Sequence, residues 1–276
     1  MKAYTKKIIA FVLVVVLTAT SCAFRGAALS AEQPLAEDLI SLGNGHDGGF
    51  ENLPAEQLLQ TALGTSKTHF TQEQYQWGCY NTDVKTAKVV ASLGEEPARS
   101  GNRFLKATAT ELWGSVRMRP VGMLLPVQQN TDYYLTFWAK NNITYDTIYA
   151  GILSPNDLRV SQAADKVKIE QTETWQPYRL RFNSGERTVI GIAFGGYKDN
   201  VEALEQSYCL DDVALYKAVS VTATAASSLF SGVAGGTVEG CGNYFPGETV
   251  TLTAVPQSGF AFSHWVGSNL ENPTAN

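Results

Sequence analysis

The chain has 276 residues, of which 44% are hydrophobic and 17% are charged, a balance that excludes a disordered protein and allows a sizeable core. Its formal net charge of −5 argues against nucleic acid as a partner. Its 24 glycines and the recurrent Thr, Val, Tyr and Phe favour many short strands joined by turns.

Residues 1–31 are predicted to be a cleaved secretory signal peptide. Three lysines precede Ile8–Leu17, an apolar run that suits a signal and is too short to span a bilayer comfortably. Small residues at 21–23 and at 28–30 offer two cleavage sites. We therefore expect a secreted or cell-surface protein.

Cys22 offers an alternative, because a cysteine soon after the apolar run can be lipidated and so anchor a protein to a membrane. Ala19 stands where a leucine is usual in that signal, so ordinary cleavage is favoured, and a short membrane anchor is favoured least. Cleavage after residue 31 would remove four basic residues and no acidic ones. The remaining 17 basic and 26 acidic residues would give a formal charge of −9.

Three cysteines lie beyond the signal, Cys79, Cys209 and Cys241, and their spacing does not indicate a zinc site. An exported protein can hold a disulfide, and Cys79 with Cys209 is the first pair to consider because both fall in the large domain. Isolated buried thiols are an equally good interpretation.

Residues 36–53 are predicted to be an entry segment of the large domain. A short helix is predicted over Pro54–Gly64, with a proline at its start and a glycine at its end. Residues 65–85 suit a loop with a short strand. From there, β-rich runs alternate with turn clusters, which is typical of a sandwich or barrel. The predicted strands are Thr86–Ser92, Arg103–Thr110, Val116–Val127, Asp132–Lys140, Thr147–Leu153, Val167–Gln171, Gln176–Phe182, Thr188–Phe194 and Tyr208–Tyr216.

A second, smaller β domain is predicted from about residue 218, where the composition shifts to small residues and threonines. Its strongest β-run is Thr249–Ala254, between Gly247 and Pro256. No completed last strand follows before Asn276, so we expect a fragment of a longer polypeptide.

Five patches of residues 43–217 resemble the carbohydrate-binding modules of families four and nine and related jelly-roll modules. The order and spacing of the patches agree with that family over most of the domain, although the stretch 54–85 is longer than expected. The patches are Gly48–Glu51 (GGFE), Gly101–Ala107 (GNRFLKA), Asn130–Lys140 (NTDYYLTFWAK), Thr172–Tyr178 (TETWQPY) and Leu210–Leu215 (LDDVAL).

The resemblance implies an all-β, jelly-roll β-sandwich over residues 36–217, in which the first and last strands lie side by side. It also implies a structural Ca²⁺ held by Glu51, Asp211 and Asp212, hard oxygen ligands that suit this ion. Alternation along the last strand predicts that Asp211 points inward with Val213 and Leu215, where a carboxylate needs a cation or hydrogen bonds. The alternative is a set of edge carboxylates that meet water.

Residues 218–276 resemble a bacterial cell-surface repeat related to the internalin B-repeats, on the patches Gly235–Val238, Gly242–Tyr244, Gly247–Ala254 and Gly259–Phe262, with Trp265 as the final aromatic. The last strand of that repeat is missing, so the resemblance implies a partial repeat. It also implies an association with a cell wall or a surface protein.

Aromatic side chains on exposed strand faces or loops could stack on the apolar faces of sugar rings. Trp113, Tyr149 and Tyr197 are the predicted ligand-binding aromatics because their neighbours are polar or glycine, and Arg117 could add hydrogen bonds. Ordinary packing is the alternative for each of them. Phe137 and Trp138 must lie on opposite faces of one strand, and Phe137 is the better core candidate.

No catalytic motif is visible, because the histidines His46, His69 and His264 are scattered and the acidic residues fall in no readable pair. The sequence therefore predicts non-catalytic polysaccharide binding. A structural or adhesion spacer with a protein partner is the alternative, and a jelly-roll glycosidase or lyase is a third interpretation.

Overall fold

The computed structural model describes residues 4–9, 13–19, 37–41, 48–52, 74–79, 89–94, 97–109, 121–157, 159–196, 205–227 and 234–266. The chain forms two compact units, Glu37–Tyr216 and the combination of Met1–Ala36 with Lys217–Asn276. Within the described ranges the only helical element is the 3₁₀ turn η1 (Val160–Gln162), and no helix is long and apolar enough to cross a membrane. The prediction of an all-β chain is confirmed.

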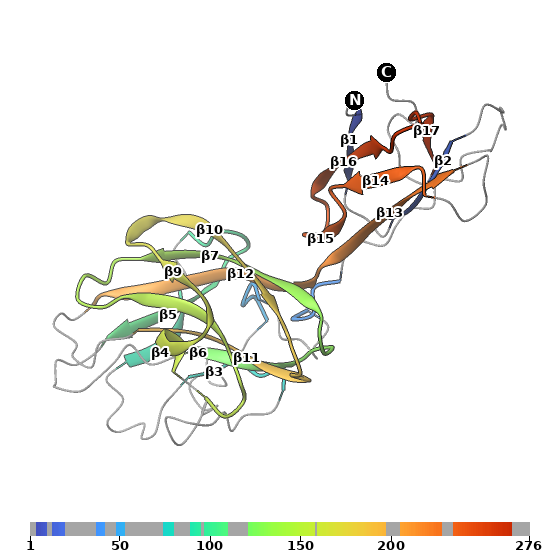
Figure 1. Ribbon diagram of the computed structural model, residues 1–276. Helices are drawn as coiled ribbons and strands as arrows, with labels where there is room; N and C mark the ends of the chain where they lie inside the picture. Colours follow the sequence, from blue (N-terminus) through green and yellow to red (C-terminus); the bar gives the residue numbers. More distant parts are fainter. Residues whose placement is uncertain are drawn as a thin grey trace. The chain divides into compact units, whose positions relative to one another are not determined.

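The large unit is a sandwich of two five-stranded sheets (Figure 1). The sheet named here the β7 sheet has the order β10 (Thr172–Asn183), β7 (Asp132–Asn141), β12 (Ser207–Lys217), β5 (Phe104–Ala109) and β4 (Val89–Gly94). The opposing β8 sheet has the order β3 (Gly78–Cys79), β6 (Val121–Pro126), β11 (Val189–Gly195), β8 (Ile148–Leu153) and β9 (Asp165–Ile169). The chain passes repeatedly between the two sheets, which gives the jelly-roll sandwich that the sequence predicts.

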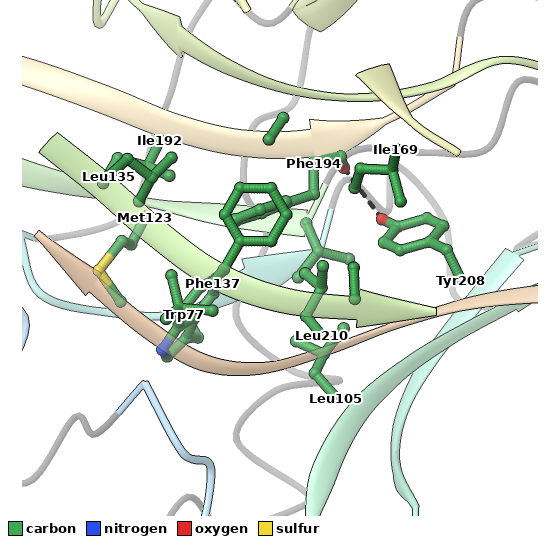
Figure 2. Close-up of a cluster of buried hydrophobic side chains, with 14 of the residues drawn as sticks. Trp77, Leu105, Met123, Leu135, Phe137, Ile169, Ile192, Phe194, Tyr208 and Leu210 are labelled. Atoms are coloured by element: carbon green, nitrogen blue, oxygen red, sulfur yellow. Dashed lines mark hydrogen bonds between the residues drawn. The ribbon is translucent and has the colours of Figure 1, made fainter. Parts of the chain in front are cut away.

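The core lies between the inner faces of the two sheets, where the alternation of each strand places its apolar residues. Phe137 of β7 is buried, stacks on Tyr178 at 5.1 Å and meets Phe194 of β11 edge-on at 5.1 Å. Figure 2 shows Trp77, Phe137 and Phe194 gathered in this cluster, with the Tyr208 hydroxyl donating to the Phe194 carbonyl at 2.9 Å. The prediction that Phe137 faces the core is confirmed.

The two ends of the large unit meet along β12. The backbone N–H of Val213 donates to the Gly48 carbonyl at 2.9 Å, and the N–H of Leu39 donates to the Leu215 carbonyl at 2.8 Å. Asp38 and Tyr216 form an antiparallel bridge on the same side. The leading segment therefore lies beside the last strand, as the family resemblance implies.

Strand β12 contains an irregularity that alternation could not reveal. Leu210 and Val213 both face the core although three positions separate them, and Asp212 between them has a φ of 48°. A positive φ at a non-glycine residue marks a local change of twist, as in a β-bulge. Asp211 and Val213 therefore do not share a face by simple alternation, although the predicted burial of Asp211 is confirmed.

Three other expectations are corrected or lie outside the described residues. Cys209 is a buried thiol on β12 that forms no disulfide in this structure, so the pairing with Cys79 is not borne out. Strand β10 begins at Thr172 and not at the predicted Gln176, so Trp175 lies within it, at a register shift. The predicted helix Pro54–Gly64 lies outside the described residues.

The small unit contains two further sheets. One has the order β1 (Tyr4–Ile9), β16 (Thr249–Pro256), β14 (Gly236–Glu239), and the other β15 (Gly242–Tyr244), β13 (Val219–Ser227), β2 (Leu13–Ala19), β17 (His264–Val266). Trp265 is buried against Phe262 at 5.6 Å in a core that includes Val221 and Leu252. Strands β1 and β2 fall within the predicted signal peptide, so cleavage of the signal would remove both.

Candidate functional site

Only one of the four predicted ligand-binding residues lies in the described part of the chain. Trp113, Arg117 and Tyr197 lie outside it. Tyr149 lies on β8, where Ile148 and Ala150 point into the core, so the tyrosine points to the outer face of the β8 sheet. It is half-buried there and packs against an apolar cluster that contains Leu153 and Val160.

The ring of Tyr149 is flanked by two lysines of the edge strand β9. Lys168 is its direct partner in the antiparallel register, and the Lys166 ammonium lies 5.9 Å from the ring centroid. Lys166 also donates to the Ala163 carbonyl at 2.8 Å, which fixes its position. The aromatic surface thus continues directly onto polar side chains at the edge of the sheet.

A pocket of about 430 Å³ opens beside Lys168, next to the outer face of the β8 sheet. Its walls come from the end of β7, the loop after it, and the end of β9 with the residues that follow. The lining residues are Asn141, Thr144, Tyr145, Asp146, Thr147, Lys168, Ile169, Glu170 and Gln171. This volume is within the range of small-molecule sites in proteins.

Two side-chain amides hold the pocket wall in place. The buried Asn141 donates to the Ile169 carbonyl at 3.2 Å and accepts from the Ile143 N–H at 3.0 Å. Gln171 donates to the Ile143 carbonyl at 2.6 Å from the other side. Because these bonds join β7, the loop and the segment after β9, the pocket is organised before any ligand enters.

The pocket combines acceptors, donors and one cation. Asp146 is only 6% exposed, and its Oδ1 accepts from the Thr147 N–H at 2.7 Å. Burial, together with the nearby Asp146 charge, raises the pKa of Tyr145 to about 12, so its hydroxyl stays protonated. Lys168 and Glu170 form an exposed ion pair at 2.6 Å. Such a mixture suits a neutral, hydroxyl-rich ligand.

Sequence reasoning found Tyr149 but missed the pocket beside it. Asp146, Lys168 and Gln171 belong to no motif and become neighbours only because β7, β8 and β9 end at the same edge. The available signal was the polar stretch from Asn141 to Thr147 between two predicted strands, where a loop can carry binding residues.

The three predicted calcium ligands lie together around one five-residue loop, residues 99–103. Asp211 Oδ2 accepts from the backbone N–H groups of Arg99 at 2.8 Å and Ser100 at 3.3 Å. Glu51 Oε1 accepts from the N–H groups of Asn102 at 2.7 Å and Arg103 at 2.9 Å.

The pKa values of two carboxylates at this loop are shifted in opposite directions. The backbone hydrogen bonds from Arg103 and Asn102 lower the pKa of Glu51. Burial raises the pKa of Asp211 to about 6, against the opposing effect of hydrogen bonds from Ser100, Asp212 and Arg99.

These carboxylates already face amide hydrogens, so a calcium ion would have to share their remaining lone pairs. Within the described ranges, no group of three or more His, Cys, Asp or Glu side chains is placed to hold a metal ion. Backbone carbonyls can complete a calcium site, as the ion takes six to eight oxygens. The calcium site therefore stays a prediction.

The small unit has the more direct similarity to known proteins. Its strands β14, β15 and β16 coincide with the patches Gly235–Val238, Gly242–Tyr244 and Thr249–Ala254, and Trp265 of β17 lies in the core. Residues 228–276 match the divergent InlB B-repeat domain. The B-repeat match covers less than half of the chain and leaves the large unit outside it. No curated protein is significantly similar in sequence to the whole chain.

Solved structures similar to the chain include carbohydrate-binding modules. The CBM22-1 xylan-binding domain of Paenibacillus barcinonensis Xyn10C is 12% identical, with 57% of this chain and 96% of that domain covered and a TM-score of 0.39. A CBM4 module is 15% identical over 51% and 86% of the two chains, with a TM-score of 0.37. A putative sugar-binding protein of Bacteroides thetaiotaomicron is 11% identical over 58% and 99%, with a TM-score of 0.38. At such TM-scores the ligand has to be inferred from the site itself.

Proposed function

We propose that the large unit binds a neutral polysaccharide without cleaving it. The observation that carries this proposal is the direct cross-strand pairing of Tyr149 with Lys168, which joins an aromatic ring to a preorganised polar pocket. One sugar would stack on the tyrosine, and its neighbour would place hydroxyl groups in the pocket. The patches that resemble carbohydrate-binding modules support the same ligand class.

The pocket residues would act by hydrogen bonding. Glu170 offers a carboxylate acceptor to sugar hydroxyls and Lys168 offers donors, whereas the nearly buried Asp146 forms part of the pocket wall. Since Asn141 and Gln171 already hold the loop, binding would cost little ordering of the wall.

Affinity electrophoresis of the full chain in gels that contain xylan, mixed-linkage β-glucan or galactan tests the proposal, followed by calorimetry on the polymer that retards it. Tyr149→Ala and Glu170→Gln should each weaken binding about tenfold, which corresponds to about 1.4 kcal/mol. Tyr244→Ala, in the small unit, and Asp157→Asn, on an exposed loop, are the matched controls and should leave binding unchanged. Retardation by none of the polymers, or equal binding by all variants, would refute the proposal.

The same experiment separates binding from hydrolysis. Incubation of each polymer with the protein should release no reducing ends, because we propose a site that positions sugars without activating water. Release of reducing ends that disappears in Glu170→Gln would instead identify the site as that of a glycosidase.

We also propose that the protein acts outside the cytoplasm, on the basis of its predicted signal. Mass spectrometry of exported protein should find an N-terminus between residues 22 and 32, and a lipid on Cys22 would identify the anchored form. The exported chain would then lack β1 and β2. A protein that retains Met1–Ala19 after export would contradict the signal.

A spacer or adhesion role with a protein partner remains the second candidate function. It is favoured by the B-repeat match at residues 228–276, which lies outside the proposed sugar site. Pull-down of a surface protein by the wild-type chain and equally by Tyr149→Ala would favour this role.

A further inference from the structure

The loop between β7 and β8, residues 142–147, supplies part of the pocket wall and is attached to both sheets of the sandwich. Towards the β8 sheet, Gln171 donates to the Ile143 carbonyl at 2.6 Å. Towards the β7 sheet, the Asn142 N–H donates to the Ser207 carbonyl at 3.1 Å, and the Ser207 N–H donates to the Asn142 side-chain oxygen at 2.8 Å. Because β7 and β12 are neighbours in one sheet (Figure 1), these last two bonds extend their pairing beyond the end of β7.

Gln206, the residue before β12, holds the loop at its bend, which spans residues 144–146. The side-chain oxygen of Gln206 accepts from the Thr144 backbone N–H at 2.8 Å, and its amide nitrogen donates to the Thr144 hydroxyl at 3.0 Å. One half-buried side chain thus holds both the backbone and the side chain of a residue that lines the pocket. Since hydrogen bonds are directional, two bonds from one planar amide fix the orientation of Thr144 as well as its position.

The residues on either side of Thr144 are fixed in a different way. Ile143 and Tyr145 are buried in the core cluster, whereas Thr144 between them is exposed. Core packing therefore sets the depth of the loop through its buried residues, and the bonds from Gln206 set the position of the exposed residue between them. Gln206 comes from the β7 sheet, although the pocket lies beside the outer face of the β8 sheet.

We propose that Gln206 is a positioning residue of the sugar site, which holds Thr144 in the pocket wall and so limits which polysaccharides fit. This inference rests on the proposed function of the pocket. A fixed wall is complementary to one arrangement of sugar hydroxyls, whereas a wall that can move adapts to several ligands and must be ordered each time one binds. Loss of the Gln206 amide should therefore lower both the affinity and the selectivity of the site.

Affinity electrophoresis and calorimetry of the full chain with xylan, mixed-linkage β-glucan and galactan test the inference. Gln206→Ala should weaken binding of the preferred polymer about fivefold and should bring its affinity closer to that of the second-best polymer. Gln206→Glu keeps a side-chain oxygen for the Thr144 N–H and should recover most of the affinity. Gln129→Ala is the matched control, because it removes a hydrogen bond from an exposed glutamine to the Glu186 carbonyl at the other end of β7, and it should change neither quantity.

Hydrogen exchange of the ligand-free variants separates positioning from loss of structure. Gln206→Ala should speed exchange in residues 142–147, while exchange in β7 and β12 and the free energy of unfolding in urea stay close to the wild-type values. The preferred polymer should slow the exchange of the same loop in the wild type.

The two proposals can be distinguished by their failures. A wild-type chain that binds none of the polymers would overturn both the sugar site and the role of Gln206. If the wild type binds, unchanged affinity and selectivity in Gln206→Ala would overturn the role of Gln206 alone. Equal losses in Gln206→Ala and Gln129→Ala, or a Gln206→Glu variant that binds no better than Gln206→Ala, would overturn it as well.

Discussion

The backbone N–H of Arg99 donates to Asp211 Oδ2 at 2.8 Å, although 112 residues separate the two in sequence. Asp211 lies on the last strand of the large unit, and the loop that carries Arg99 connects β4 with β5 of the same sheet. This contact links the loop that carries Arg99 to the predicted calcium ligands, because one buried carboxylate positions the backbone from which the Arg99 guanidinium reaches the Trp138 ring, 4.1 Å from its centroid.

Asp211→Ala should destabilise the large unit strongly. The substitution leaves the N–H groups of Arg99, Ser100 and Asp212 without their acceptor, and unsatisfied buried donors are costly. We expect the free energy of unfolding in urea to fall by about 2–4 kcal/mol. Asp157→Ala, at the surface, removes an ion pair with Arg159 and a hydrogen bond from the Arg159 backbone N–H, and should cost about 1 kcal/mol or less. Equal effects of the two substitutions would contradict the structural role of Asp211.

The raised pKa of Asp211 predicts a pH dependence of stability. Burial raises its pKa to about 6, above the value near 3.9 in an unfolded chain, so the folded state binds more protons between these values. The contribution of Asp211 to stability is therefore complete below about pH 4 and is lost as the pH rises through 6. The loss should be on the order of 2–3 kcal/mol.

Urea unfolding of the wild type and of Asp211→Asn between pH 4 and 7.5 measures this contribution. The difference in unfolding free energy between the two proteins should change across pH 4–7, because asparagine does not titrate. A difference that stays constant over that range would show that Asp211 titrates in the folded protein as it does in water.

Calcium should stabilise the large unit if the predicted ligands hold it. Glu51, Asp211 and Asp212 each contact the loop of residues 99–103, and a divalent cation there would relieve the repulsion between Asp211 and Asp212. We expect the melting temperature at pH 7.5 to rise on addition of calcium and to fall again with a chelator, and Glu51→Gln to reduce the rise. Identical melting curves with calcium and with chelator would refute the metal site.

The sequence predicts those parts of the molecule that depend on local alternation. Phe137 and Trp138 alternate on a strand of regular geometry, so the prediction of one core and one outer residue is confirmed. The contact between the leading segment and the last strand was predicted only through the resemblance, since no local pattern joins Gly48 to Val213.

The remaining parts depend on geometry that no local pattern encodes. The positive φ of Asp212 shifts the alternation of β12, and an aspartate gives no more than a weak signal for such a conformation. The pocket arises where three strand ends meet, so Asp146 and Lys168 become neighbours through the fold and not through spacing. The place of Trp175 was missed because the strand was predicted to begin at Gln176, whereas Trp175 lies within β10 beside Lys140.

Adjacent glycines provide a matched test of the closure of the sandwich. A Cβ at Gly48 would overlap the carbonyl oxygen of Val213, whereas a Cβ at Gly49 would meet no atom within 4 Å. Gly48→Ala should therefore separate the leading segment from β12 and lower the free energy of unfolding by about 3 kcal/mol or more. Gly49→Ala should change it by about 0.5 kcal/mol or less. Since both substitutions add the same methyl group to neighbouring positions, only the contact with β12 distinguishes them, and equal stabilities in urea would mean that the two ends do not meet.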